Sequence, residues 1–571
     1  MGGELTDRWR FIAQGVPWQT LILSFYQLPW CAHVPRACVG ALIIIAMYLR
    51  AGVFSLVLLM VSRLLGLARE SVQAAAFGAS GLGDVAIVMF TLPDVLVGVF
   101  LSGALSYVLL PLWAGQTVAQ QSASQSRLAK WLLLGGVLAG AALWQARGTL
   151  SRALAPGLTG DMQALSAASL SWSAAVLPLA MLAALWATRL QHARDFVGMY
   201  AGSLWVNALL LIALLLVALK AFKTPALDAL GVMHVLGVFL LLAMLVRLAW
   251  LGWRLPRVSS GLKMQAVDAS GAGLPPAKVW FWAALSSGLL LLLPLMARSL
   301  ASQAGEGALA TFNYAWKLIE LPLVLAVQLV ASVAFAAITH TAPGTPERQQ
   351  ALQTAFGVAW ALACAAAAVV AMFSMPLATA LFGWGRMGPT ALQIIADWAA
   401  VGVWSLLPQA LMAVLLTVMA LSRRMHVAVG VYAAGLAALL VWGLFGGNIY
   451  ENNSSLGMQN AGSGVMFALN VVLTCMAAAL LVTERAQLKN ALLWRSLALP
   501  LAVSVAVVQL KPWVAGWGVW PSAAAAAACG LLVVGSGLAA HPLLRAWLSA
   551  RWPPLAGQTR RTKPKAPTAS D

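Results

Sequence analysis

The stretch AGVFSLVLLMVSRLLGLARES, Ala51 to Ser71, joins an apolar run to a segment with two arginines. Its first part, Ala51–Val61, carries no charge and suits the hydrocarbon core of a bilayer. Arg63 and Arg69 follow, and the first acidic residue within this stretch is Glu70. A charged side chain at the bilayer centre costs roughly 2.5–3.5 kcal/mol on insertion scales, so both arginines are expected to face protein or water.

Composition extends this pattern to the whole chain. Of the 571 residues, 61% are hydrophobic and only 9% are charged, whereas about a quarter of the residues of a soluble protein are charged. Apolar runs of about 20 residues recur along the chain, each long enough to cross a bilayer. The runs are continuous rather than alternating, which excludes a membrane barrel. We therefore predict an all-α polytopic membrane protein.

The apolar runs predict about fourteen spans. They cover residues 47–67, 81–111, 129–147, 165–190, 198–219, 229–251, 279–301, 308–338, 351–374, 391–421, 427–446, 461–482, 493–513 and 519–546.

The basic residues predict the orientation. The net charge is +19, and Lys and Arg are expected to gather in cytoplasmic loops. With residue 47 inside, these loops hold Arg127, Lys130, Arg189, Arg194, Arg247, Arg254, Arg257, Lys263, Lys278, Arg348, Arg423, Arg424, Arg485, Lys489 and Arg495. Both termini are then cytoplasmic. No basic stripe is interleaved with aromatics, so nucleic acid is not an expected partner.

Residues 1–46 are an atypical extension that mixes Pro, Trp and Cys. We favour Met47 as the true translation start over an extra hydrophobic hairpin. Cys31, His33 and Cys38 match no standard zinc spacing, so we predict neither a metal site nor a cofactor. Residues 547–571 form a basic tail that we expect to be disordered.

A short repeat suggests two related halves. Leu-Pro-x-Val-Leu occurs at Leu92–Leu96 and again at Leu321–Leu325, six predicted spans later. Two copies of a six-helix unit would account for this spacing, related by an axis along the membrane normal. If the two helices face each other across a cleft, Asp84 and Lys317 lie on opposite walls.

This repeat gives the domain prediction. An N-lobe spans 47–251, a cytoplasmic linker 252–278, a C-lobe 279–482, and two further helices 493–546.

Several charged residues fall inside predicted spans. They are Arg63, Arg69, Asp84, Asp94, Arg298, Lys317, Glu320 and Asp397. Lys317 and Glu320 share a helix face at i, i+3, so they either form an intrahelical ion pair or present a binding cation tuned by a carboxylate, and both readings can hold. Arg69 either faces the interior or extends to the interface. Asp94 follows Pro93, and we interpret it as a hydrogen-bonding residue at a helix bend. Arg298 and Asp397 receive no role.

The cations among these residues outnumber their candidate partners. A cleft with surplus positive charge suits an anion, and guanidinium groups suit phosphate in particular. The residues alone therefore predict a transporter for an amphipathic anion. Paired carboxylates and Gly-rich phosphate loops are lacking in the sequence, so an enzyme acting on polyprenyl-linked sugars is not expected.

The segment 62–111 resembles the opening of the MurJ (MviN) family, lipid II flippases of the MOP (multidrug/oligosaccharidyl-lipid/polysaccharide) exporter superfamily. Matching residues, in order, are Ser62, Arg63, Leu65, Gly66, Arg69, Glu70, Phe77, Gly78, Ala79, Asp84, Leu92, Pro93, Gly103, Ala104, Ser106 and Pro111. A second match is NYAWKLIELP, Asn313–Pro322. Weaker matches are LAPGL (154–158) and ALFGWGR (380–386).

The resemblance implies a function. Lipid II, the lipid-linked peptidoglycan precursor, would move from the cytoplasmic to the outer leaflet of a bacterial inner membrane by alternating access. Membrane potential or a coupled ion would drive transport, and the protein is expected to act as a monomer among membrane lipids. The last two helices would form a groove for the polyprenyl chain. The implied binding residues for the pyrophosphate headgroup in a central cavity are Arg63, Arg69, Asp84, Lys317 and Glu320.

The chain also departs from the family pattern. Val97 and Gly98 replace positions that are usually or often arginine, Ser102 replaces an acidic residue, and Lys317 replaces an arginine. The loss of these charges leaves two alternatives open: a diverged flippase or exporter of another anionic lipid-linked oligosaccharide, or a non-transporting scaffold.

Overall fold

The computed structural model describes residues 36–98, 104–223, 228–259, 274–323, 345–422, 424–446, 457–485, 494–514 and 516–541. These residues form helices joined by short turns, with no strand among them. Nine of the described helices are long and apolar enough to cross a membrane, or ten if the two halves of α10 (Ala277–Ser302), which meet at a 44° bend, count as one span. The predicted all-α membrane fold is confirmed, whereas the count of fourteen spans remains a prediction.

The chain divides into two compact units, Met1–Met60 and Val61–Asp571. Helix α3 (Arg36–Phe77) begins in the first unit, 11 residues before the predicted span at 47. The apolar run Cys38–Ala46 contains no proline or glycine except Gly40, so nothing in it ends the helix early. Cys31 and His33 lie outside the described residues. All packing described below belongs to the second unit.

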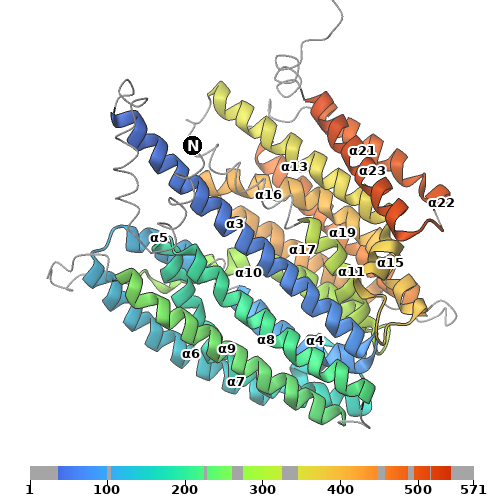
Figure 1. Cartoon of the computed structure of the whole chain (residues 1–571), viewed down its shortest axis with the longest axis horizontal. Helices are drawn as coiled ribbons and strands as arrows, with labels where there is room; N and C mark the ends of the chain where they lie inside the picture. The colour runs from blue at the N-terminus through green and yellow to red at the C-terminus, as the bar shows by residue number, and fades with distance from the viewer. Residues whose placement is uncertain are drawn as a thin grey trace, which may run out of the picture. The chain divides into compact units, whose positions relative to one another are not determined.

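One set of helices follows α3 in the sequence. They are α4 (Gly81–Val97), α5 (Ser106–Ala114), α6 (Val118–Leu154), α7 (Gly160–His192), α8 (Phe196–Lys223) and α9 (Ala229–Ser259). Helix α7 contacts α4, α5, α6, α8 and α9, and α6 to α9 lie side by side in Figure 1. Serine hydroxyls fix two of these contacts: Ser173 Oγ donates to the Met89 carbonyl at 2.6 Å, and Ser151 Oγ lies 2.7 Å from Ser166 Oγ. Small hydroxyl residues of this kind are typical of helix packing in membranes.

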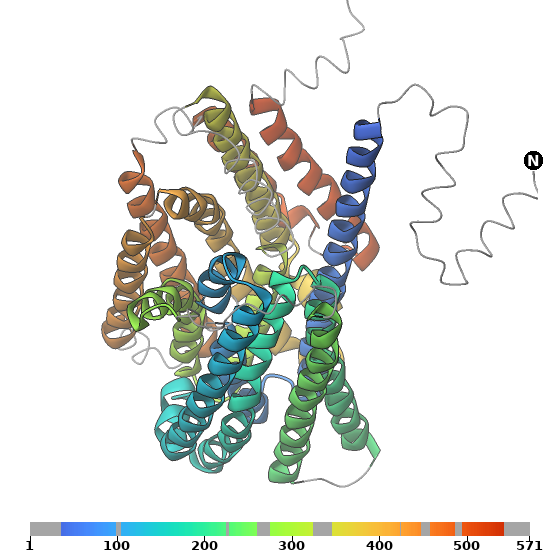
Figure 2. The same cartoon turned by 90° about the vertical axis from the view of Figure 1, so that its left-hand side faces the viewer.

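A second set comprises α10 and the helices that come after it. They are α11 (Ala308–Pro322), α13 (Pro346–Met372), α14 (Ser374–Phe382), α15 (Pro389–Gly402), η4 (Val403–Ser405), α16 (Leu406–Leu421), α17 (Met425–Gly446) and α19 (Gly457–Thr483). Helices α21 (Trp494–Val508) and α23 (Val519–Ala540) pack on α13, and the short α22 (Lys511–Val514) lies between them in the chain. Figure 2 shows the second set beside the first.

The two sets meet where α4 contacts α11 and where α10 contacts α5 and α6. Helix α11 is almost wholly buried at this junction, with Phe312, Tyr314 and Ile319 among its fully buried side chains. The two helices that carry the Leu-Pro repeat therefore touch each other. The lobe boundaries predicted from the sequence remain predictions.

Candidate substrate-binding site

Charged side chains from both sets converge near α3 and α11. The guanidinium of Arg69 donates to Glu70 Oε1 at 2.8 Å, and both side chains are about nine-tenths buried. The other carboxylate oxygen of Glu70 accepts a 2.9 Å hydrogen bond from Asn313 Nδ2 of α11. Arg69 also lies against the ring of Phe90, at 5.9 Å. Glu70 thus joins α3 to α11, because each of its two carboxylate oxygens accepts a hydrogen bond.

Lys317 and Glu320 form an ion pair on α11. Lys317 Nζ donates to Glu320 Oε2 at 2.8 Å, and the side chains retain 24% and 31% of their exposure. Arg298 of α10 donates to Thr91 Oγ1 of α4 at 2.9 Å. Glu70 interacts electrostatically with both Lys317 and Arg298. The Arg298–Thr91 hydrogen bond joins α10 to α4, and the Asn313–Glu70 hydrogen bond joins α11 to α3.

Asp94 of α4 lies among these cations. Its carboxylate is 4.0 Å from the Arg69 guanidinium, and its side chain is 59% exposed. It interacts electrostatically with Arg69, Lys317 and Arg247, and Arg298 interacts with it in turn.

We name this group the charged cluster. Its members are Arg63, Arg69, Glu70, Asp94, Arg247, Arg298, Lys317 and Glu320. Arg63 belongs because it interacts electrostatically with Glu320. The cluster holds five cations and three carboxylates of the described chain. Several members are partly exposed.

The cluster includes four of the five binding residues expected from the sequence: Arg63, Arg69, Lys317 and Glu320. Arg63 has an exposed side chain and forms no ion pair within the described residues. Arg69 does not extend to the interface, because it is buried against Glu70. Lys317 and Glu320 form the expected pair and also belong to the cluster. A role in substrate binding remains a prediction for each residue.

The predictions from the sequence missed or misplaced three residues of the charged cluster. Arg247 was predicted in a cytoplasmic loop, but α9 continues to Ser259 and places it inside the helix. Arg298 had no assigned role, and only the fold brings it to Thr91. Glu70 was not proposed as a site residue, although its position directly after Arg69 was a usable signal. The Asp94 carboxylate accepts no hydrogen bond from the described residues, its nearest contact being Arg69 at 4.0 Å, so the interpretation as a hydrogen-bonding side chain at a helix bend is not supported.

Asp84, the fifth expected binding residue, makes a different contact. Its two carboxylate oxygens accept hydrogen bonds from the backbone N–H groups of Gly307 and Ala310, both at 2.7 Å. Asp84 is 1% exposed and thus caps the N-terminus of α11. Asp84 and Lys317 are therefore not on opposite walls of a cleft. A direct role for Asp84 in substrate binding stays a prediction.

Further backbone contacts accompany this cap. The Arg386 N–H donates to the Ala75 carbonyl at 2.8 Å, and Ser71 Oγ donates to the Leu381 carbonyl. Gly307 has φ of 85°, and a Cβ there would lie 2.5 Å from the Ala79 carbonyl oxygen. A Cβ at Gly157 would overlap the Ser302 carbonyl. We call these contacts the seam. They join the end of α3, the start of α4 and the α6–α7 turn to the second set.

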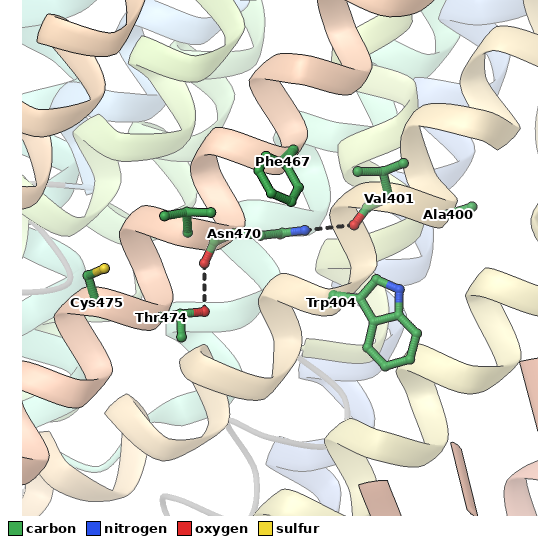
Figure 3. Close-up of a pocket in the computed structure, with 8 residues that line it drawn as sticks. Ala400, Val401, Trp404, Phe467, Asn470, Thr474 and Cys475 are labelled. Atoms are coloured by element: carbon green, nitrogen blue, oxygen red, sulfur yellow. Dashed lines mark hydrogen bonds between the residues drawn. The ribbon is translucent and has the colours of Figure 1, made fainter. Parts of the chain in front are cut away.

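A cavity of about 500 Å³ lies apart from these residues, between α15, η4 and α19. Val401, Trp404, Phe467 and Asn470 are among its lining residues, and Asn470 Nδ2 donates to the Val401 carbonyl (Figure 3). None of the charged cluster lines it. The predicted central cavity is therefore not this one, and it remains a prediction supported by the exposure of Asp94, Lys317 and Glu320.

Comparison with known protein families shows which family this chain belongs to. The family model described as lipid II flippase MurJ matches residues 73–524. The chain belongs to the MurJ family. Within this family it is 26% identical over 363 residues to a probable lipid II flippase MurJ of Rhizobium meliloti, covering 60% of the chain. It is 27% identical over 373 residues to the lipid II flippase MurJ of Burkholderia cenocepacia, covering 59% of the chain.

The chain spans 64% and 66% of the length of these two relatives. Its fold matches a MurJ structure in an inward closed conformation, with TM-score 0.69 at 13% identity, covering 87% of this chain and 99% of that one. A MATE family transporter of the MOP superfamily in an inward-facing conformation matches with TM-score 0.56 at 14% identity, covering 76% of this chain and 98% of that one. These likenesses establish the MOP-type fold of this MurJ family member.

Proposed function

We propose that this chain moves lipid II from the cytoplasmic to the outer leaflet of a bacterial inner membrane. The observation that carries the proposal is the charged cluster, in which α3 and helices of both sets supply five cations against three carboxylates. Lipid II carries a diphosphate, and guanidinium groups bind phosphate oxygens through paired N–H donors. The names of the MurJ relatives support this choice of substrate.

The positions of the cluster and the seam support alternating access as the transport mechanism. The basic-loop pattern orients the turns at 78–80 and 303–307 toward the outside. The seam then closes the outer side, while the cluster lies deeper, where α4 and α11 continue inward. Opening the seam and closing the inner side would expose a bound headgroup to the outer face. Sets of packed helices make such changes by moving as rigid bodies.

The direction of transport agrees with membrane energetics. An anionic headgroup that moves outward across an inside-negative potential gains about 2.3 kcal/mol per charge per 100 mV. We therefore propose the membrane potential as one source of energy, with a coupled ion as the alternative. Helices α21 and α23, packed on α13, would guide the polyprenyl chain. We propose that the protein acts as a monomer surrounded by membrane lipids, with both termini in the cytoplasm.

Growth rescue tests the proposed function. A bacterium depleted of its own lipid II flippase would express this chain, Arg63→Ala, Lys317→Ala or the control Arg147→Ala. Arg147 is partly exposed on α6, and its guanidinium donates to the nearby Trp144 carbonyl. We expect the wild type and the control to restore growth, and the two cluster variants to fail at equal membrane abundance. Failure of well-inserted wild type would instead favour another anionic lipid-linked oligosaccharide or a scaffold.

A further inference from the structure

Asp94 is an unusual carboxylate because several cations interact with it and none of the described ones donates a hydrogen bond to it. Arg69, Arg247, Arg298 and Lys317 all interact with it electrostatically. Its nearest ion-pair distance is 4.0 Å, to Arg69, and more than half of its side chain is exposed. No described residue donates a hydrogen bond to it. A carboxylate in such surroundings normally accepts several charge-assisted bonds.

The surrounding cations direct their bonds elsewhere. Arg69 donates to Glu70, Arg298 to Thr91 and Lys317 to Glu320. The Nε atoms of Arg69, Arg247 and Arg298 have no hydrogen-bond partner within the described chain. The acceptors present therefore do not saturate the guanidinium donors, an arrangement that is uncommon for buried polar groups. A ligand with several acceptor oxygens would supply what Asp94 alone does not.

We propose that the anionic headgroup of the transported lipid binds among Arg69, Arg247, Arg298 and Lys317, and that Asp94 is a tethered counter-ion that competes with it. This inference rests on the proposed function and adds two binding residues, Arg247 and Arg298, to it. Asp94 partly neutralises the four cations when the site is empty. A diphosphate carries more charge and more acceptor oxygens than Asp94, so it replaces Asp94 as the partner of the four cations.

The competition has a physical use in transport. Five cations against two remaining carboxylates would hold a diphosphate tightly, and a transporter must also release its substrate. A carboxylate beside the site weakens binding by like-charge repulsion. It also offers the cations a partner when the headgroup leaves. Asp94 is thus a specificity-determining residue, because it favours ligands of more than one negative charge.

Binding of farnesyl diphosphate to the purified full chain in nanodiscs tests this assignment, with farnesol as the uncharged control ligand. We expect Arg247→Gln and Arg298→Gln to weaken the affinity for the diphosphate by about tenfold each, as loss of one close charge contact predicts. Asp94→Asn is expected to tighten it by about fivefold or more, since like-charge repulsion is removed. Asp161→Asn, at an exposed position on α7, is the matched control and should change nothing.

The arginine variants are expected to weaken binding and Asp94→Asn to tighten it, so the two roles predict opposite changes in affinity. A merely structural role for Asp94 predicts weaker binding or none in Asp94→Asn and Asp94→Ala, and either result overturns the proposal, as does unchanged affinity. Unchanged binding in both arginine variants overturns the assignment of Arg247 and Arg298. If the wild type binds farnesyl diphosphate no better than farnesol, the diphosphate recognition in the proposed function itself fails, which this experiment separates from failure of the Asp94 assignment.

Discussion

The carboxylate of Asp84 accepts a 2.7 Å hydrogen bond from the backbone N–H of Gly307, across the junction between α4 and α11. The contact links the start of one helix to the start of the other, 223 residues apart in the chain. A buried carboxylate that caps a helix is stabilised by both the hydrogen bonds and the helix dipole. The seam therefore includes one buried carboxyl side chain alongside its backbone contacts.

Replacing the carboxyl group of Asp84 is expected to open the seam. Asp84→Asn turns one acceptor into a donor that faces an N–H group, which costs about 1–3 kcal/mol. The measurement is the labelling rate, by a membrane-impermeant maleimide, of Ala308→Cys in a background without the native cysteines. Ala308 is fully buried at the seam. We expect at least fivefold faster labelling in Asp84→Asn, and no change in the control Asp161→Asn. Equal rates in all backgrounds would contradict a locking role.

Gly157 tests the seam by steric means. A methyl group there would overlap the Ser302 carbonyl, so Gly157→Ala should separate the two sets at this point and accelerate labelling of the same cysteine. Gly160→Ala is the control, since Gly160 has φ of 51° but nothing within 4 Å of an added Cβ. The control measures the cost of backbone strain alone, about 1–2 kcal/mol. If both variants label alike, close approach at Gly157 does not hold the seam.

Exchanging Lys317 and Glu320 on α11 distinguishes a structural role of this ion pair from a role in transport. The double variant Lys317→Glu with Glu320→Lys retains an i, i+3 ion pair and should keep the melting temperature within a few degrees of the wild type. It moves the cation by one helical turn, so we expect growth rescue to be lost. Lys317→Arg, which keeps the charge in place, should retain rescue. Full rescue by the double variant would reduce the pair to a structural role.

The Asp195–Arg254 pair makes stability depend on pH. Arg254 donates to both carboxylate oxygens of Asp195 at 2.9 and 2.7 Å. Burial raises the pKa of Asp195, but the hydrogen bonds from Arg254 and the Gly198 N–H outweigh it and leave the pKa below its usual value. The pair therefore stabilises the fold above about pH 4 and loses its effect as the pH falls through the lowered pKa.

Asp195→Asn should consequently lower the melting temperature at pH 7 by a few degrees, because a hydrogen-bonded charge is worth about 1.5–3 kcal/mol. The difference from the wild type should begin to shrink below about pH 4, where the carboxyl of the unfolded chain becomes protonated, and should be lost as the pH falls through the lowered pKa of the folded state. Thermal unfolding in detergent at several pH values measures both effects. A difference that grows on acidification would contradict the assignment.

The sequence predicted what depends on local composition. The helical membrane class and the approximate positions of most spans follow from the length and hydropathy of each apolar run. The pairing of Lys317 with Glu320 follows from helical spacing alone. The start of α3 and the end of α9 were misplaced, because hydropathy locates the membrane-embedded part of a helix rather than its ends.

Contacts between distant segments could not be predicted. The hydrogen bonds of Arg298 to Thr91 and of Asn313 to Glu70 join residues 207 and 243 positions apart, and no local pattern encodes them. Asp84 was singled out as an ionisable residue inside a predicted span, but its partners are backbone N–H groups, which carry no sequence signal. The membership of Arg247 in the cluster depends on the packing of α9 against α7 and α8, which the sequence does not reveal.

The amount of lipid II exposed at the outer leaflet tests the central claim most directly. It is measured by an impermeant probe in cells depleted of their own flippase that express this chain or its variants. The proposed function predicts that the wild type and Arg147→Ala restore exposure, and that Arg63→Ala combined with Lys317→Ala leaves it at the level of depleted cells. Restoration by this double variant to the wild-type level, at equal protein abundance, would contradict a role for the charged cluster in moving lipid II.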